Sequence, residues 1–215
     1  FQTSLSIEAI KDNKQSSISI NKTDKNSIDN SVQSLMDNVN SSQEDKGHDI
    51  SKNQASEVFS KGNLNPDLNL MYDRLDEFNE HVKDNHKKII LEAAMLDHTA
   101  SMSHIMNTNG VDFEVKKGIY HFSPMFTSKD GVKTSSFNYT YFSALELNEK
   151  IKDKGYLSEL LYQSEEQVNV SPIKNKFVGD IIVTPHCLSD FLSFIENSIS
   201  DGAIISGTSI YKDKI

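Results

Sequence analysis

Two glycine-containing turn signals constrain the fold of this chain more than any other feature of its sequence. Asn109-Gly110 separates residues 101–108 from 111–116, and Asp130-Gly131 separates residues 120–128 from 132–142. Both dipeptides favour tight turns with left-handed backbone, and the segments beside them have the length and composition of strands. The sequence therefore predicts an antiparallel meander in the middle of the chain.

The first third of the chain predicts a hairpin and two helices. Apolar and polar residues alternate over residues 3–10 and 16–20, which is typical of two antiparallel strands. Apolar residues at helical spacing predict one helix over about 27–40, with Asp24 or Asn26 as its N-cap. A longer helix is expected from Asp76 or Glu77 to about Leu96. The polar stretch 41–76 between them predicts a loop with short pieces of structure.

The last third predicts helices around one buried strand. A helix is expected over residues 156–167, before the punctuation at Ser171-Pro172, and a buried strand over 180–183. Thr184-Pro185 then starts a helix that ends at Asp201-Gly202. Its apolar residues are expected in the core, namely Leu188, Phe191, Leu192 and Ile195.

Strands and helices do not alternate regularly, so we expect an α+β fold of antiparallel hairpins and a meander packed with amphipathic helices, without a doubly wound parallel sheet. We expect one domain over residues 1–172 and the start of a second, truncated domain over 173–215. Strand-like residues at Phe1 and before Ile215 indicate a piece of a longer polypeptide.

Charge and hydropathy disfavour several classes of protein. The net charge of −9 disfavours broad contact with a phosphate backbone, so no nucleic-acid partner is expected. No apolar run approaches the roughly 20 residues that cross a bilayer, and no leader stands at the front. We therefore expect a cytoplasmic protein without a membrane partner. The single cysteine, Cys187, cannot form an internal disulfide.

The seven histidines do not form a recognisable metal motif. His81 and His86 are five residues apart, about 140° around a helix, and are expected on different faces. His186 and Cys187 are adjacent after a proline at a helix start, where neighbouring side chains diverge. An autonomous zinc enzyme that uses scattered histidines stays open as a hypothesis, with His98, His104 and His121 as its ligands.

Other catalytic and nucleotide-binding signatures are missing from the sequence. No Gly-rich phosphate loop and no Gly-x-Ser-x-Gly elbow occurs. The acidic pair Glu165 and Glu166 is most simply interpreted as solvated helix surface.

Three stretches, in order, resemble the TldD/PmbA family, which is associated with modulation of DNA gyrase and with peptidase activity. The first runs from Ser16 to Asp49 and ends in Ser-Gln-Glu-Asp followed by Gly47. The second is the turn 107–111, Asn-Thr-Asn-Gly-Val. The third joins Gly-Asp-Ile-Ile-Val-Thr-Pro at 179–185 to Ser-Gly-Thr-Ser-Ile-Tyr at 206–211. The resemblance covers the N-terminal and central portion of the family.

Within that family, the resemblance implies the PmbA (TldE)-like branch. The TldD branch carries His-Glu-x-x-x-His, in which two histidines bind zinc and the glutamate polarises water. The corresponding residues here are Ser193, Phe194 and Ser198. None of them can hold or activate a zinc-bound water, so we expect no catalytic residue, no metal site and no cofactor in this chain. Zinc is expected only in a TldD-like partner.

The resemblance therefore implies a noncatalytic subunit of a metallopeptidase complex that acts on unfolded or modified peptides. The expected partners are a TldD-like metallopeptidase subunit and an extended peptide bound by strand addition. Self-association is left open. Candidate peptide-contact or turn residues are Asn107, Asn109 and Gly110. The alternative is an inert or scaffolding fragment from a truncated gene.

Overall fold

The computed structural model describes residues 2–214, without the side chain of His186. The chain forms two compact units, one of residues up to 61 with Ser101–Lys117, the other of Gly62–Ala100 with the residues from Gly118 onward. The strand-like ends expected at Phe1 and Ile215 lie outside the described residues. The expected domain boundary after residue 172 stays a prediction.

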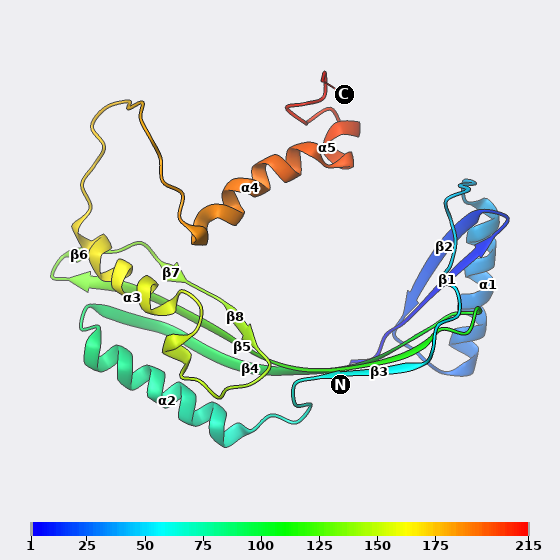
Figure 1. The fold of residues 1–215 in the computed structure, drawn as a ribbon, viewed down its shortest axis with the longest axis horizontal. Coiled ribbons are helices and arrows are strands. Elements are labelled where there is room, and N and C mark those ends of the chain that lie inside the picture. Colours follow the sequence, from blue (N-terminus) through cyan, green and yellow to red (C-terminus); the bar gives the residue numbers. More distant parts are fainter. Residues whose placement is uncertain (1, 215) are drawn as a thin grey trace. The chain divides into compact units, whose positions relative to one another are not determined.

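The first unit contains a hairpin covered by a helix. Strands β1 (Leu5–Lys11) and β2 (Lys14–Ile20) pair antiparallel through a tight turn in which Asp12 and Asn13 have φ of 53° and 57°. Helix α1 (Lys25–Ser41) packs on this hairpin and is capped by Asp24, whose side chain accepts a hydrogen bond from the Ser27 N–H (Figure 1). The predicted hairpin and first helix are confirmed.

The predicted loop 41–76 contains a strand that the sequence did not reveal. Strand β3 (Glu57–Lys61) runs parallel to β5 (Asp112–Asp130), with Glu57 opposite Phe113 and Lys61 opposite Lys117. All five residues of β3 are exposed. A strand this short, without a buried face, lacks the alternation by which strands are recognised.

The second predicted helix is wrong in its position. Helix α2 spans Leu68–Asn85, and the segment from Ile89 belongs to strand β4 (Ile89–Met106). Asp67 starts the helix earlier because its carboxylate accepts the Leu70 N–H at 3.0 Å. The helix ends at His86, whose φ of −125° and ψ of 70° are not helical. Alanine and leucine in the following segment favour a helix locally, but pairing with β5 decides for a strand.

The larger sheet is built around β5, whose part from Gly118 onward belongs to the second unit. In the sheet order β5 lies between β3 and β4, and its later part also pairs antiparallel with β6 (Lys133–Thr134), β7 (Asn138–Tyr139) and β8 (Phe142–Ala144). The predicted turn at Asp130-Gly131 is confirmed, with φ of 61° at Gly131, but the returning strand is broken into these three pieces. The α+β class is confirmed, with one mixed sheet in place of a purely antiparallel meander.

Helices α2 and α3 (Leu157–Glu166) enclose the core of this unit together with the 3-10 turns η1 (Ile151–Asp153) and η2 (Gln167–Asn169) (Figure 1). The rings of Phe78 on α2 and Phe122 on β5 meet edge to face, with centroids 5.1 Å apart. Ile151, Leu157 and Leu161 are fully buried against them. The predicted helix over 156–167 is confirmed.

The C-terminal part agrees with the sequence in its helix start and differs in its burial. Helix α4 (Pro185–Ile199) begins at the predicted proline, and Asp201-Gly202 opens a further helix, α5 (Asp201–Ile205). The predicted buried strand 180–183 is wrong, because Ile181 and Ile182 are 78% and 92% exposed and no strand lies beside them within residues 2–214. The core assignment on α4 is also wrong: Leu188, Phe191, Leu192 and Ile195 are all more than 40% exposed.

Among the described residues, no helix has the length and hydrophobicity needed to cross a membrane.

Candidate functional site

The turn between β4 and β5 holds the candidate contact residues. The Asn107 carboxamide oxygen accepts hydrogen bonds from the Asn109 and Val111 N–H groups at 3.0 and 3.1 Å. Its amide nitrogen donates to the Ser51 carbonyl at 2.8 Å, and the Asn109 amide donates to the same carbonyl at 3.2 Å. Gly110 has φ of 91° and carries the left-handed backbone of the turn.

These bonds engage the carboxamide of Asn107 and the side-chain nitrogen of Asn109 inside the first unit. The left-handed conformation, predicted for both Asn109 and Gly110, falls on Gly110 alone. The geometry therefore explains the Asn-Thr-Asn-Gly sequence as a turn that also binds the Ser51 carbonyl. A contact of these three residues with a peptide stays a prediction.

The Ser-Gln-Glu-Asp segment has a local structural role as well. The Asp45 N–H donates to the Asn13 carbonyl at 2.8 Å, and the Asn13 amide donates to the Glu44 carboxylate at 3.3 Å. The Asp45 carboxylate accepts the Gly47 N–H at 2.7 Å. The segment thus fixes the β1–β2 turn against the end of α1.

At the zinc-motif positions, the two serine hydroxyls hydrogen-bond to backbone carbonyls of their own helix. Ser193 Oγ donates to the Ser189 carbonyl and Ser198 Oγ to the Phe194 carbonyl, each at 2.7 Å. Phe194 is exposed. Hydroxyls used in this way are not ligands for zinc, and a phenyl ring cannot act as a base. That this chain binds no metal at positions 193, 194 and 198 stays a prediction.

The scattered histidines have separate partners. His98 Nε2 lies 2.8 Å from the Asn63 carbonyl, and His104 Nε2 lies 3.8 Å from Glu114. His121 contacts Tyr141 and Ser143. No group of three or more histidine, cysteine, aspartate or glutamate side chains in the described part of the chain is arranged to hold a metal ion.

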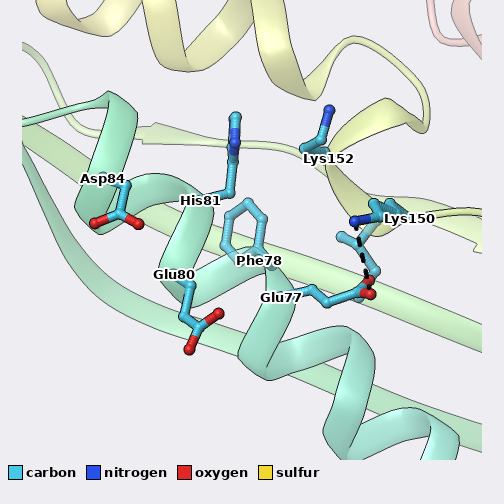
Figure 2. Close-up of a pocket in the computed structure, with 8 residues that line it drawn as sticks. Glu77, Phe78, Glu80, His81, Asp84, Lys150 and Lys152 are labelled. Atoms are coloured by element: carbon cyan, nitrogen blue, oxygen red, sulfur yellow. Dashed lines mark ion pairs between the residues drawn. The ribbon is translucent and has the colours of Figure 1, made fainter.

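A hollow in the second unit lies between α2 and η1. It measures about 230 Å³, and Glu77, Glu80, His81 and Asp84 of α2 face Lys150 and Lys152 across it. Figure 2 shows the His81 ring beside Phe78, with Glu77 paired to Lys150 at 3.8 Å. Pockets for drug-sized ligands occupy about 300–1,000 Å³, so this hollow takes a small polar group and is too small for a peptide.

His81 borders this hollow, and its pKa is lowered there. The Asn85 amide donates to His81 Nδ1 at 3.1 Å and to the His81 carbonyl at 2.9 Å, so the ring proton lies on Nε2. Burial lowers the pKa of His81 below its ordinary value, and the neighbouring His86 and Lys152 lower it further. In this tautomer the ring can donate a hydrogen bond from Nε2.

His86 lies against His81, contrary to the expectation from helical spacing. Their ring centroids are 5.5 Å apart because His86 follows the last helical residue and leaves the helical path. His86 Nδ1 lies 2.9 Å from Glu165 Oε2, and Glu165 Oε1 accepts the Lys88 N–H at 3.1 Å. The interpretation of Glu165 as solvated surface is therefore wrong, whereas Glu166 is exposed. Placing the end of the helix at Asn85 would have allowed the sequence to predict this cluster, because His86 then leaves the helical path.

No protein-family model matches the sequence, and no curated protein matches it.

The fold is similar to solved structures. TldE from Thermococcus kodakarensis matches with a TM-score of 0.65 at 13% identity, over 97% of this chain and 48% of that chain. A proposed modulator of DNA gyrase from Bacteroides thetaiotaomicron gives 0.62 at 16% identity, over 99% and 50%. One from Thermotoga maritima gives 0.56 at 14% identity, over 100% and 49%. This chain spans about half the length of these proteins, and the resemblance noted in the sequence is confirmed at the level of the fold.

Proposed function

We propose that the chain belongs to the PmbA (TldE)-like branch of the TldD/PmbA family and serves as a noncatalytic subunit of a cytoplasmic metallopeptidase complex. The observation that carries the proposal is the TldE fold over 97% of the chain, combined with serine and phenylalanine at the zinc-motif positions of α4. The partner is a TldD-like subunit, which supplies zinc and the activated water. The complex acts in proteolysis or maturation of unfolded or modified peptides.

The residues of α4 support the noncatalytic assignment. Ser193 and Ser198 hydrogen-bond to helix carbonyls, and Phe194 has no group that can accept a proton. A water molecule at this helix would therefore meet neither a Lewis acid nor a base from these positions. Cleavage chemistry is left to the partner.

A free sheet edge supports contact with extended peptides. β4 is the terminal strand of its sheet in the described order, so one side of its backbone has no strand neighbour. Its part within the second unit, residues 89–100, contains no proline, glycine or lysine, the residues that commonly protect edges from pairing. A peptide added as a strand would be held mainly by main-chain hydrogen bonds, which suits substrates of varied sequence.

The test is reconstitution with a TldD-like protein that carries His-Glu-x-x-x-His. We expect the two chains to co-elute in size-exclusion chromatography and this chain to change the rate of zinc-dependent cleavage of an unfolded peptide. This chain alone serves as the control and should not cleave the peptide. Neither a complex nor an effect on cleavage would contradict the proposal and favour the scaffolding alternative.

A further inference from the structure

In the described part of the second unit, the helices of the core pack on one face of the sheet and leave the other face without a helix. The opposite face of β5 is buried under α2 and α3 through Phe122 and Phe126. Side chains alternate along a strand, so His121 and Met125 point to the uncovered face. On β4, Ala94 and Leu96 pack against the core, and the intervening Met95 is exposed.

A row of aromatic side chains lies on this uncovered face. Phe137, Tyr139 and Tyr141 are 54%, 66% and 60% exposed. Tyr139 is directly opposite Met125 in the β5–β7 pair, and the Tyr141 ring stacks on His121 with a centroid distance of 5.6 Å and an angle of 18° between planes. We call this surface the outer face. It includes Glu92, Met95, Asp97, Met125, Tyr139 and Tyr141.

The outer face also carries carboxylates without ion pairs. Glu92 lies on it, since its carboxylate is 3.4 Å from Thr127 Oγ1, and Asp97 lies between two residues that face the core side, Leu96 and His98. Within the described residues neither Glu92 nor Asp97 has a lysine, arginine or histidine partner within 4.0 Å. By strand alternation Lys129 follows on the same face, at the far end of β5.

We propose that the outer face binds an extended polypeptide segment that bears arginine or lysine side chains. Guanidinium and ammonium groups are attracted to the faces of exposed tyrosine rings, and nearby carboxylates complete the recognition of a cation. Aromatic residues of this kind are enriched at protein interfaces and depleted on surfaces that stay in water. The proposal stands independently of the assignment to a metallopeptidase complex.

The charges argue against a second copy of the chain as the occupant. Each copy carries a net charge of −9, so two copies repel one another. A second copy could offer lysines but no free guanidinium, because the single arginine, Arg74, already donates to Glu77 and to the carbonyls of Leu147 and Asn148. A basic partner of different sequence fits the outer face better.

The first experiment measures binding of a short peptide that alternates arginine and threonine, which presents all its cations on one side when extended. Isothermal titration calorimetry gives the affinity, and a glutamate-threonine peptide is the matched control. We expect the arginine peptide alone to bind, more weakly as salt rises. Tyr139→Leu and Tyr141→Leu should each weaken binding about two- to fivefold. Tyr72→Leu, at an equally exposed tyrosine on α2, should leave it unchanged.

A second readout needs no substitution on the outer face. The chain has six methionines, of which Met95 and Met125 lie on this face while Met36 and Met71 lie on α1 and α2. With methyl-labelled methionine, the arginine peptide should shift the NMR signals of Met95 and Met125 and leave those of Met36 and Met71 in place. The proposal is overturned if the arginine peptide does not bind, if the acidic peptide binds equally, or if the shifts map to α1 or α2.

Discussion

At the scale of single residues, two glycines make a backbone crossing in the second unit feasible. A Cβ atom on Gly118 would lie 1.9 Å from the Asn63 carbonyl oxygen, and one on Gly62 would lie 2.0 Å from the Gly118 carbonyl oxygen. Gly62 also has φ of 70°. The same Asn63 carbonyl lies 2.8 Å from His98 Nε2, so the crossing is tied to β4 as well. Only glycine permits backbones to approach this closely.

We predict that Gly118→Ala lowers the free energy of unfolding by about 2 kcal/mol or more, because rigid backbone atoms must move to admit the methyl group. Urea denaturation followed by circular dichroism measures the change. Gly202→Ala is the matched control, since nothing lies within 4 Å of its Cβ position in helix α5. An unchanged stability of Gly118→Ala would mean that the Asn63 segment does not cross β5 at this point.

At the scale of elements, α3 forms hydrogen bonds with the short connection between α2 and β4. The Glu165 carboxylate contacts the His86 ring with one oxygen and the Lys88 N–H with the other. The side chains of His86 and Glu165 are 12% and 20% exposed, so the pair is largely shielded from water. A second contact joins β5 to α3, because the Ser128 and Ser164 hydroxyls form a hydrogen bond of 2.8 Å. The position of α3 thus depends on polar contacts as well as on its buried leucines.

We predict that Glu165→Ala lowers the free energy of unfolding by roughly 1.5–3 kcal/mol, the range for hydrogen bonds to charged groups. Thermal and urea unfolding measure this effect near neutral pH. Glu166→Ala changes the neighbouring, exposed carboxylate of the same helix and should cost much less. Equal effects of the two substitutions would contradict the role given to Glu165.

At the scale of the whole molecule, the fold is similar to that of TldE, and several polar side chains form hydrogen bonds within the chain. The turn amides of Asn107 and Asn109, the serines of α4 and the carboxylate of Glu165 all bond within the chain. Among the described residues, the surfaces without an internal partner include the apolar side of α4, the edge of β4 and the outer face. Exposed apolar surfaces of this kind are candidates for contact with other polypeptides.

We predict that protein purified without chelators contains far less than one zinc ion per chain. The reason is the absence of imidazole, thiolate or carboxylate ligands at positions 193, 194 and 198. Inductively coupled plasma mass spectrometry measures the metal content, with the TldD-like partner prepared in the same way as the positive control. Stoichiometric zinc that survives dialysis of this chain alone would contradict the noncatalytic assignment.

Local sequence patterns predicted a structural feature correctly where the physical cause of that feature is also local. Asn109-Gly110 and Asp130-Gly131 specify turns through backbone conformation, and Pro185 marks the start of α4 through its fixed φ. Helix α1 follows from its apolar spacing and the Asp24 cap. The α+β class and the resemblance to the TldD/PmbA family depend on the order of such signals, which is why the sequence revealed them.

Contacts between residues far apart in the chain decided the features that the sequence did not predict. Ile89 to Leu96 has residues that suit a helix, yet it is a strand because β5 supplies hydrogen-bond partners along it. Ile181 and Ile182 suit a strand, yet no neighbour pairs with them in the described residues. His81 and His86 meet only because the helix ends between them. The sequence thus determined the turns, caps and class of this fold, whereas strand partners, buried contacts and the uncovered outer face came from tertiary structure, since they join residues far apart in the chain.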